Sequence, residues 1–135
     1  MSNTPTLFTP LQIGPVTAPN RIAVAPMCQY TADDGSMTDW HLQHHMNLAM
    51  SGAGLVMIEA TGVERRGRIT HGCVGLYSDA NERAMARVLA AARAVQLPGT
   101  LIGIQLQHAG RKASAQRPWE GGAALKAEQI GRAHV

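Results

Sequence analysis

An α/β fold is predicted by three short apolar runs that alternate with two helical segments. The runs Ile22–Ala25, Leu55–Ile58 and Leu101–Leu106 are bounded by Gly, Pro or polar residues, as strands buried on both faces are. The segments between them, at about 39–51 and 81–96, have helical patterns. Strands joined through helices require crossovers, and therefore a parallel sheet. Two architectures satisfy this order, a doubly wound open sheet and a section of a (β/α)8 barrel.

The segments around these strands carry their own turn and cap signals. Residues 1–20 are rich in Pro and Thr and contain the turn pair Gly14-Pro15, which predicts a small hairpin-like lead-in. Thr38 or Asp39 can cap the first helix, and Asp79 can cap the second. The expected apolar face of the first helix consists of Leu42, Met46 and Ala49. Each element therefore has a local signal for where it begins.

Composition narrows the class of protein. The 135 residues fit one modest domain, and 45% apolar with 16% charged residues argues against disorder. The net charge of +3 is scattered and aromatics make up only 4%, so a nucleic-acid surface is not expected. No apolar run approaches the roughly 20 residues of a membrane span, and no secretory signal opens the chain. Cys28 and Cys73 form no CxxC pair. We therefore expect a cytoplasmic protein with no membrane or nucleic-acid partner.

Polar groups and small residues follow every predicted strand. Pro26–Tyr30 follows the first strand, Glu59–Gly62 the second, and Gln105–Lys112 closes the third. Ligands bind at the carboxyl ends of strands in both candidate architectures. These segments predict a flat, hydrogen-bonding ligand that approaches the backbone closely. Neither GxGxxG nor GxxxxGK[ST] is present, so a dinucleotide-binding Rossmann unit or a phosphate loop lacks its main support.

Two of these strand-end residues each have two interpretations. Cys28, directly past the first strand, is either an ordinary buried thiol or a group that faces the ligand. Gln105 places a long amide inside an apolar run. If that amide is buried it needs partners, because an unmade hydrogen bond costs roughly 1–3 kcal/mol. A neighbouring strand or a ligand can supply them.

The first helix carries three histidines at helical spacing. His41, His44 and His45 stand at i, i+3 and i+4, on or near one face, as metal ligands could. No HExxH motif and no carboxylate within the helix completes such a set. We therefore interpret them as packing and surface histidines, and expect no metal.

Five collinear segments resemble the Old Yellow Enzyme family. They are LFTPLQIG (7–14), NRIAVAPMCQY (20–30), GAGLVMIEATGV (52–63), RGRIT (66–70) and IGIQLQHAGRKAS (102–114). They are most similar to the bacterial class of NADPH dehydrogenases that has a cysteine in the flavin site. The resemblance spans residues 7 to about 125, and several motifs in the correct order make it specific.

The resemblance implies a fold, a cofactor and a reaction. The fold is a (β/α)8 barrel with an N-terminal hairpin, of which this chain supplies the first three βα units. The cofactor is FMN, and the reaction is the NADPH-driven reduction of activated C=C bonds in enone-type small molecules. The implied flavin contacts are Ala25, Pro26, Met27, Cys28, Ala60 and Gln105. The resemblance also gives Cys28 a hydrogen bond near the reactive edge of the flavin, and Tyr30 a place in the substrate pocket.

Other functional groups of the family lie on later strands. They include the residues that bind the substrate carbonyl, the proton-donating tyrosine, and the loops that hold the FMN phosphate. Typical barrels need about 250 residues. The catalytic proton donor is therefore expected beyond residue 135. We expect this chain alone to be inactive and the full-length parent to be a candidate homo-oligomer. The alternative to an enzyme is a non-catalytic α/β module that binds a small ligand at the same strand ends.

The last six residues have a different expected origin. Ile130–Val135 reads as one translation frame of a widely used sequencing adapter. We therefore expect residues 1–129 to be the N-terminal part of an FMN-binding barrel, and residues 130–135 to be a non-native tail.

Overall fold

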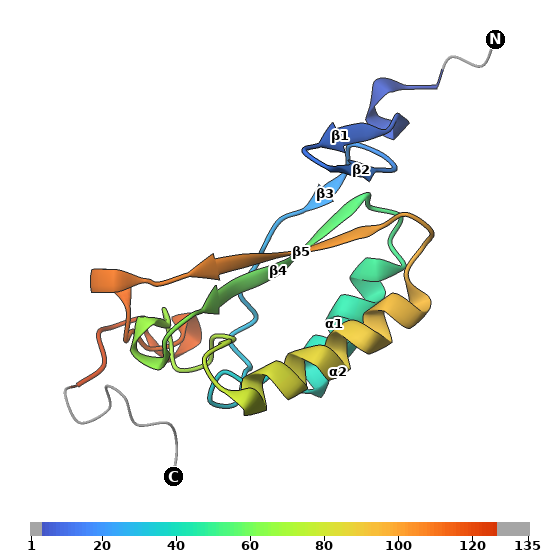
Figure 1. Ribbon diagram of the computed structural model, residues 1–135. Coiled ribbons are helices and arrows are strands. Elements are labelled where there is room, and N and C mark those ends of the chain that lie inside the picture. Colours follow the sequence, from blue (N-terminus) through green and yellow to red (C-terminus); the bar gives the residue numbers. More distant parts are fainter. Residues whose placement is uncertain (1–3, 127–135) are drawn as a thin grey trace.

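An antiparallel hairpin leads into the fold (Figure 1). The computed structural model describes residues 4–126. A single 3-10 turn at Thr6–Phe8 precedes β1 (Leu11–Ile13) and β2 (Val16–Ala18), which pair in antiparallel register. Gly14 turns the chain between them with a φ of 55°, a value that glycine adopts without strain. The predicted hairpin lead-in is confirmed.

Three parallel strands and two crossover helices form the rest of the fold. The sheet has the order β3 (Ala23–Val24), β4 (Leu55–Gly62) and β5 (Leu101–Gln107). The first crossover contains α1 (Asp39–Ala49), and the second contains α2 (Asp79–Val95). Both helices cover the same side of the sheet (Figure 1). Doubly wound sheets carry helices on both sides, whereas barrels carry them only outside, so the arrangement is that of a barrel segment.

The hydrophobic core lies between the sheet and these helices. Val56 and Ile58 of β4 are 1% and 2% exposed, and Ile58 packs in one cluster with Val88 and Met85 of α2. Successive residues of a strand point to opposite faces, so Met57 points away from the helices. Met57 is only half-buried. The two faces of the sheet therefore differ, one covered by helices and one open.

A β-bulge interrupts the pairing of β4 with β5. Ile58 pairs with Ile104, but the next pair is Ala60 with Gln105, which leaves Glu59 as the extra residue. Bulges re-aim side chains and are common next to functional sites. Here the bulge places Glu59, which is 1% exposed, against His41 of α1.

The structure corrects two sequence expectations about the helices. Ser78, not Asp79, caps α2: its hydroxyl accepts a hydrogen bond from the Asn81 N–H at 3.3 Å. The fully buried side chains of α1 are those of His41, His45 and Ala49. The apolar pattern correctly included Ala49 but missed the two histidines, because it counts histidine as polar, whereas burial between β4 and α2 favours the neutral rings.

Thr38, one of the two expected candidates, caps α1, and its N–H donates to Nδ1 of His41 at 3.0 Å.

In the described part of the chain, no helix is both long enough and apolar enough to cross a membrane. The proposed tail, 130–135, lies outside the described residues.

Candidate functional site

The carboxyl ends of the three strands bring the predicted ligand contacts onto the open face of the sheet. Ala25 immediately follows β3, while Ala60 and Gln105 are register partners on β4 and β5. Ala60 is 7% exposed, whereas Gln105 is exposed. Within residues 4–126, the Gln105 side-chain amide makes no hydrogen bond. The Gln105 amide was expected to bond either to a neighbouring strand or to a ligand. In this part of the chain, no neighbouring strand supplies the partner.

The segment that leaves β3 carries the other predicted contacts. Met27 is 67% exposed, and Pro26 and Cys28 are half-buried. The Gln29 side chain donates to the Met27 carbonyl at 2.7 Å, and the Gln29 N–H donates to Oε2 of Glu59 at 3.1 Å. The bulged strand β4 therefore fixes the path of the segment that follows β3.

Tyr30 ends this segment in a strained conformation. Its φ is +56°, which non-glycine residues rarely adopt and which is concentrated at functional sites. The Tyr30 ring packs edge-on against Trp119, with centroids 5.9 Å apart. Trp119 belongs to a short 3-10 turn, Pro118–Glu120, that follows β5. Tyr30 thus stands between the end of β3 and the segment after β5.

A buried acid and imidazole support the site from the helix side. His41 Nε2 lies 3.6 Å from Oε2 of Glu59, and both side chains are shielded from water. Since His41 Nδ1 accepts the Thr38 N–H, its Nε2 carries the ring proton and faces Glu59. Burial raises the pKa of Glu59 to about 7 and lowers the pKa of His41 to about 4. Near pH 5 to 6, both groups are therefore neutral.

His45 lies buried on the same helix face, and burial lowers its pKa to about 4 as well. The histidines were expected to be packing and surface residues, and the burial of His41 and His45 confirms the packing part. His44 is half-buried, with its ring 5.3 Å from that of His45. Residues 4–126 contain no group of three or more His, Cys, Asp or Glu side chains that could hold a metal ion.

Cys28 and Cys73 meet beside this acid. The two thiols influence each other's pKa, and the backbone of Ala60 also acts on that of Cys28. Cys73 is fully buried, and its sulfur accepts the Thr70 N–H at 3.3 Å. The interaction with Cys73, together with burial, raises the pKa of Cys28, and the interaction with Cys28 lowers the pKa of Cys73. No sequence pattern predicts this proximity, because the two cysteines are far apart along the chain.

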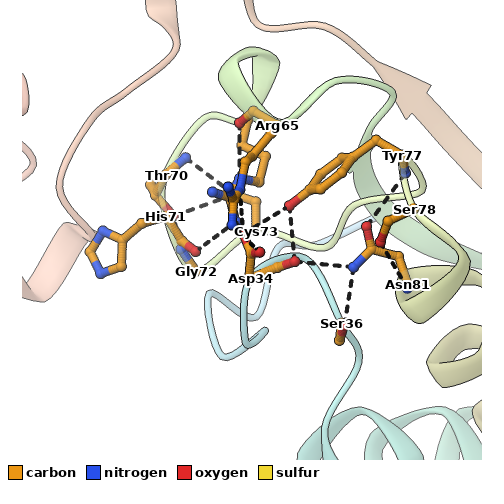
Figure 2. Close-up of polar contacts among 11 residues, drawn as sticks. Asp34, Ser36, Arg65, Thr70, His71, Gly72, Cys73, Tyr77, Ser78 and Asn81 are labelled. Carbon is orange, nitrogen blue, oxygen red and sulfur yellow. Dashed lines mark hydrogen bonds and ion pairs between the residues drawn. The ribbon is translucent and has the colours of Figure 1, made fainter. Parts of the chain in front are cut away.

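The loop after β4 is tied to the turn before α1 through Asp34 (Figure 2). Arg65 binds the Asp34 carboxylate with two donors, and Arg68 Nη1 lies 3.4 Å from Oδ1. The Tyr77 hydroxyl and the Asn81 amide donate to the Asp34 carbonyl at 2.9 Å and 3.0 Å. Hydrogen bonding by Arg65 holds the pKa of Asp34 below its ordinary value.

This network fixes the loop that carries Cys73. The Arg68 side chain is 5% exposed and donates to the His71 carbonyl at 3.2 Å, which orders the chain two residues before Cys73. No sequence pattern predicts a role for Asp34 or Arg68, whereas Glu59 was expected among the polar strand-end groups that meet a ligand and is instead buried against His41. Only their proximity in the fold shows what they do.

Known proteins match this chain over most of its length. The model of the NADH:flavin oxidoreductase / NADH oxidase family matches residues 6–131. The NADH:flavin oxidoreductase FG08077 of Gibberella zeae is 46% identical over 93% of this chain and 30% of its own length. The NADPH dehydrogenase of Bacillus subtilis is 40% identical over 82% of this chain and 32% of its own.

Solved structures agree with these relatives. Morphinone reductase superposes with a TM-score of 0.71 and 33% identity, over 81% of this chain and 28% of that one. The old yellow enzyme of Trypanosoma cruzi gives a TM-score of 0.70 and 33% identity, over the same shares. The chain thus spans about a third of the length of the proteins it matches, at the start of their barrel. It belongs to the NADH:flavin oxidoreductase / NADH oxidase family, which confirms the resemblance to Old Yellow Enzyme.

Proposed function

We propose that the whole protein is an FMN-dependent oxidoreductase that uses NADPH to reduce activated C=C bonds of enone-type small molecules. In this proposal residues 1–129 form the N-terminal part of its FMN-binding barrel. Family membership supports the chemistry, and the strand ends support the place of the cofactor. The observation that carries the proposal is the exposed Gln105 amide beside Ala60, on the open face of the sheet.

The residues at this edge fit a flavin ring. Ala25 and Ala60 have the smallest side chains that a strand end can offer short of glycine, so a flat ring can approach the backbone. The Gln105 amide, unpartnered within residues 4–126, can both donate and accept, as the alternating edge of the flavin pyrimidine requires. The half-buried Cys28 thiol lies within the same edge and adds a weak donor.

Each residue then has a defined task. FMN, when bound, supplies the hydride chemistry. Gln105 binds the pyrimidine edge and orients the ring, while Pro26 and Met27 pack against it. Cys28 places its thiol near the reactive edge, and Tyr30 lines the pocket for the substrate. We place the proton donor and the groups that hold the FMN phosphate outside residues 1–135.

The test uses a completed protein, in which this chain is followed by the remaining barrel of the Bacillus subtilis NADPH dehydrogenase. Gln105→Leu keeps the side-chain volume and removes both hydrogen bonds. A lost hydrogen bond at a buried site costs roughly 1–3 kcal/mol, so the Kd for FMN rises about 5- to 150-fold. Titration of the apoprotein, followed by FMN fluorescence, measures this.

The matched control is Gln43→Leu, the same change at an exposed position of α1. This variant keeps the parental Kd. An unchanged Kd in Gln105→Leu contradicts the proposed flavin contact. A completed protein that ignores added FMN contradicts the proposed function and favours a non-catalytic binding module.

A further inference from the structure

Three segments that leave different strands pack together beside Tyr30. The segment after β3 meets the loop after β4, where the Ala32 N–H donates to the Gly72 carbonyl at 2.9 Å. Gly72 leaves no room for a Cβ, which would overlap both the carbonyl oxygen of Tyr30 and Nε of Arg117. Arg117 belongs to the segment after β5, so this glycine lies where all three strand-end segments meet.

The segment after β5 holds Trp119 in a fixed turn. Trp119 lies in the 3-10 turn Pro118–Glu120. One carboxylate oxygen of Glu120 accepts the Arg117 N–H at 3.0 Å, and the other lies 3.6 Å from Nε2 of His71 in the loop after β4. The turn is therefore closed by its own side chain and tied to a neighbouring strand-end segment.

Trp119 is anchored on one side and uncovered on the other. Its ring meets the Tyr30 ring edge-on, with centroids 5.9 Å apart and planes at 82°. The Arg117 guanidinium lies 6.0 Å from the centroid of the indole. Within residues 4–126, Trp119 is nevertheless 63% exposed. An indole held on a fixed turn offers a large, flat contact surface and loses little conformational entropy when it binds a second ring.

We propose that Trp119 is a specificity-determining residue, whose indole stacks on an aromatic substituent of the substrate. The inference rests on the proposed function, in which Tyr30 lines the substrate pocket, and it names a class of substrate: enones that carry an aryl group on the C=C bond. Tyr30 positions the indole through the edge-on contact. Because the aryl group takes no part in the reaction, this contact strengthens binding of the ground state and the transition state equally. Trp119 therefore acts on KM and leaves kcat unchanged.

The test compares two substrates of the completed protein, 2-cyclohexenone and 4-phenyl-3-buten-2-one, of which only the second has an aryl group. An aromatic pair is worth enough to change an equilibrium constant roughly 2- to 12-fold. In Trp119→Leu, KM for the aryl enone rises by this factor, while its kcat and both constants for 2-cyclohexenone stay at parental values. The Kd of the aryl enone for the oxidised protein rises by the same factor. It is measured from the flavin absorbance without NADPH, and so does not depend on turnover.

Two further variants control for the loss of a large side chain. Trp119→Phe keeps an aromatic face, so it restores part of the preference for the aryl enone. Trp40→Leu removes a similarly exposed tryptophan, 54% against 63%, whose indole N–H donates to Gln29 on the helix side. This variant keeps the parental ratio of the two KM values.

Three outcomes contradict the proposal. An equal rise of KM for both substrates in Trp119→Leu shows that the indole does not select for the aryl group. A lower midpoint of urea denaturation with an unchanged preference shows that the rest of the barrel covers Trp119 and that the indole supports the fold. If FMN binds and both enones are reduced, either result removes this proposal alone. A completed protein that binds no FMN removes the proposed function, and this proposal with it.

Discussion

The two faces of the β3–β4–β5 sheet differ in composition although they are built from the same strands. On the covered face, Val56 and Ile58 are almost completely buried, and Ile58 packs against α2. On the open face, Ala25 and Gln105 are exposed and Met57 is half-buried. Because strand residues alternate between faces, a single sequence can separate stability from ligand binding. The covered face holds the fold together, and in the proposed function the open face takes the cofactor and the rest of the barrel.

The contrast between the covered and the open face of the sheet ends at the β4 bulge. Before it, the covered face is apolar; at Glu59 it becomes acidic and meets His41. Burying two ionisable groups is costly unless they are neutral or paired. The raised pKa of Glu59 and the lowered pKa of His41 favour the neutral form of both groups. Glu59 also accepts a hydrogen bond from the Gln29 N–H, and this bond fixes the segment on which the candidate flavin contacts lie.

The largest effect is expected when the chain is expressed by itself. Within residues 4–126, β3 and β5 are edge strands, and the open face exposes Leu55, Met57 and Leu101 in part. Unpaired edges and uncovered apolar surface favour aggregation. We expect no sharp thermal transition by circular dichroism, binding of a hydrophobic dye, and no NADPH oxidation above background. A soluble monomer with a cooperative transition and stoichiometric FMN would contradict this.

The next largest effect tests, in the completed protein, whether the covered face supports the fold while the open face supports FMN binding. Ile58→Ala opens a cavity in the covered face, and such changes cost about 2–5 kcal/mol. Urea denaturation therefore shows a lower midpoint, while the Kd for FMN, measured where the variant is folded, stays at the parental value. Gln105→Leu is expected to show the reverse pattern. If Ile58→Ala weakens FMN binding as strongly as it weakens the fold, the two faces are not separate.

The sequence predicted the elements better than it predicted their contacts. The three apolar runs located all three parallel strands, because strands buried in a barrel need continuous apolar residues. On α1, periodicity correctly placed Ala49 in the interior and Leu42 against the core, but it missed His41 and His45, which are buried there as well. A histidine looks polar in a sequence, and only burial against β4 and α2 shows that it is neutral.

A pH-dependent effect of similar or smaller size is expected from Glu59. Its folded-state pKa of about 7 lies above the ordinary value of 4.5, so folding favours the protonated acid. The stability that this provides is fully present below pH 4.5 and is lost as the pH rises through 7, by about 3 kcal/mol at most. Glu59→Gln mimics the neutral acid and escapes this loss.

The difference in unfolding free energy between Glu59→Gln and the parent should therefore grow in favour of the variant from pH 4.5 to 7. His41 acts in the opposite direction: its depressed pKa provides stability above pH 6.5 that is lost as the pH falls through 4. Both proteins share the contribution of His41, so this contribution cancels in the difference. Urea titrations at several pH values measure the difference in unfolding free energy. A difference that is constant with pH would show that Glu59 is ionised in the folded protein.

The site was predictable only where the resemblance reached it. Cys28 and Gln105 were chosen from motifs at strand ends: Gln105 pairs with Ala60 and Cys28 lies on the segment after β3, and their contact with a flavin stays a prediction. Cys73 was not chosen, because its role depends on a contact between the segments after β3 and β4, and no local pattern encodes that contact. The same applies to Asp34, which acts through Arg65 and Tyr77 from another part of the chain.

The smallest effect on binding, and the sharpest test of the open face, is expected from Cys28→Ala. The thiol is a weak donor, and alanine fills part of its volume, so the Kd for FMN should change less than in Gln105→Leu. A group near the reactive edge of a flavin nevertheless tunes its electronics. The reduction potential of bound FMN and the rate of NADPH oxidation should therefore change together, as followed by dye-coupled titration and stopped-flow absorbance. Cys73→Ser is the control, because it removes the partner thiol but keeps Cys28 at the edge. If potential and rate stay at parental values in Cys28→Ala, this residue only packs, and Gln105 becomes the main tested contact of the open face with the ring.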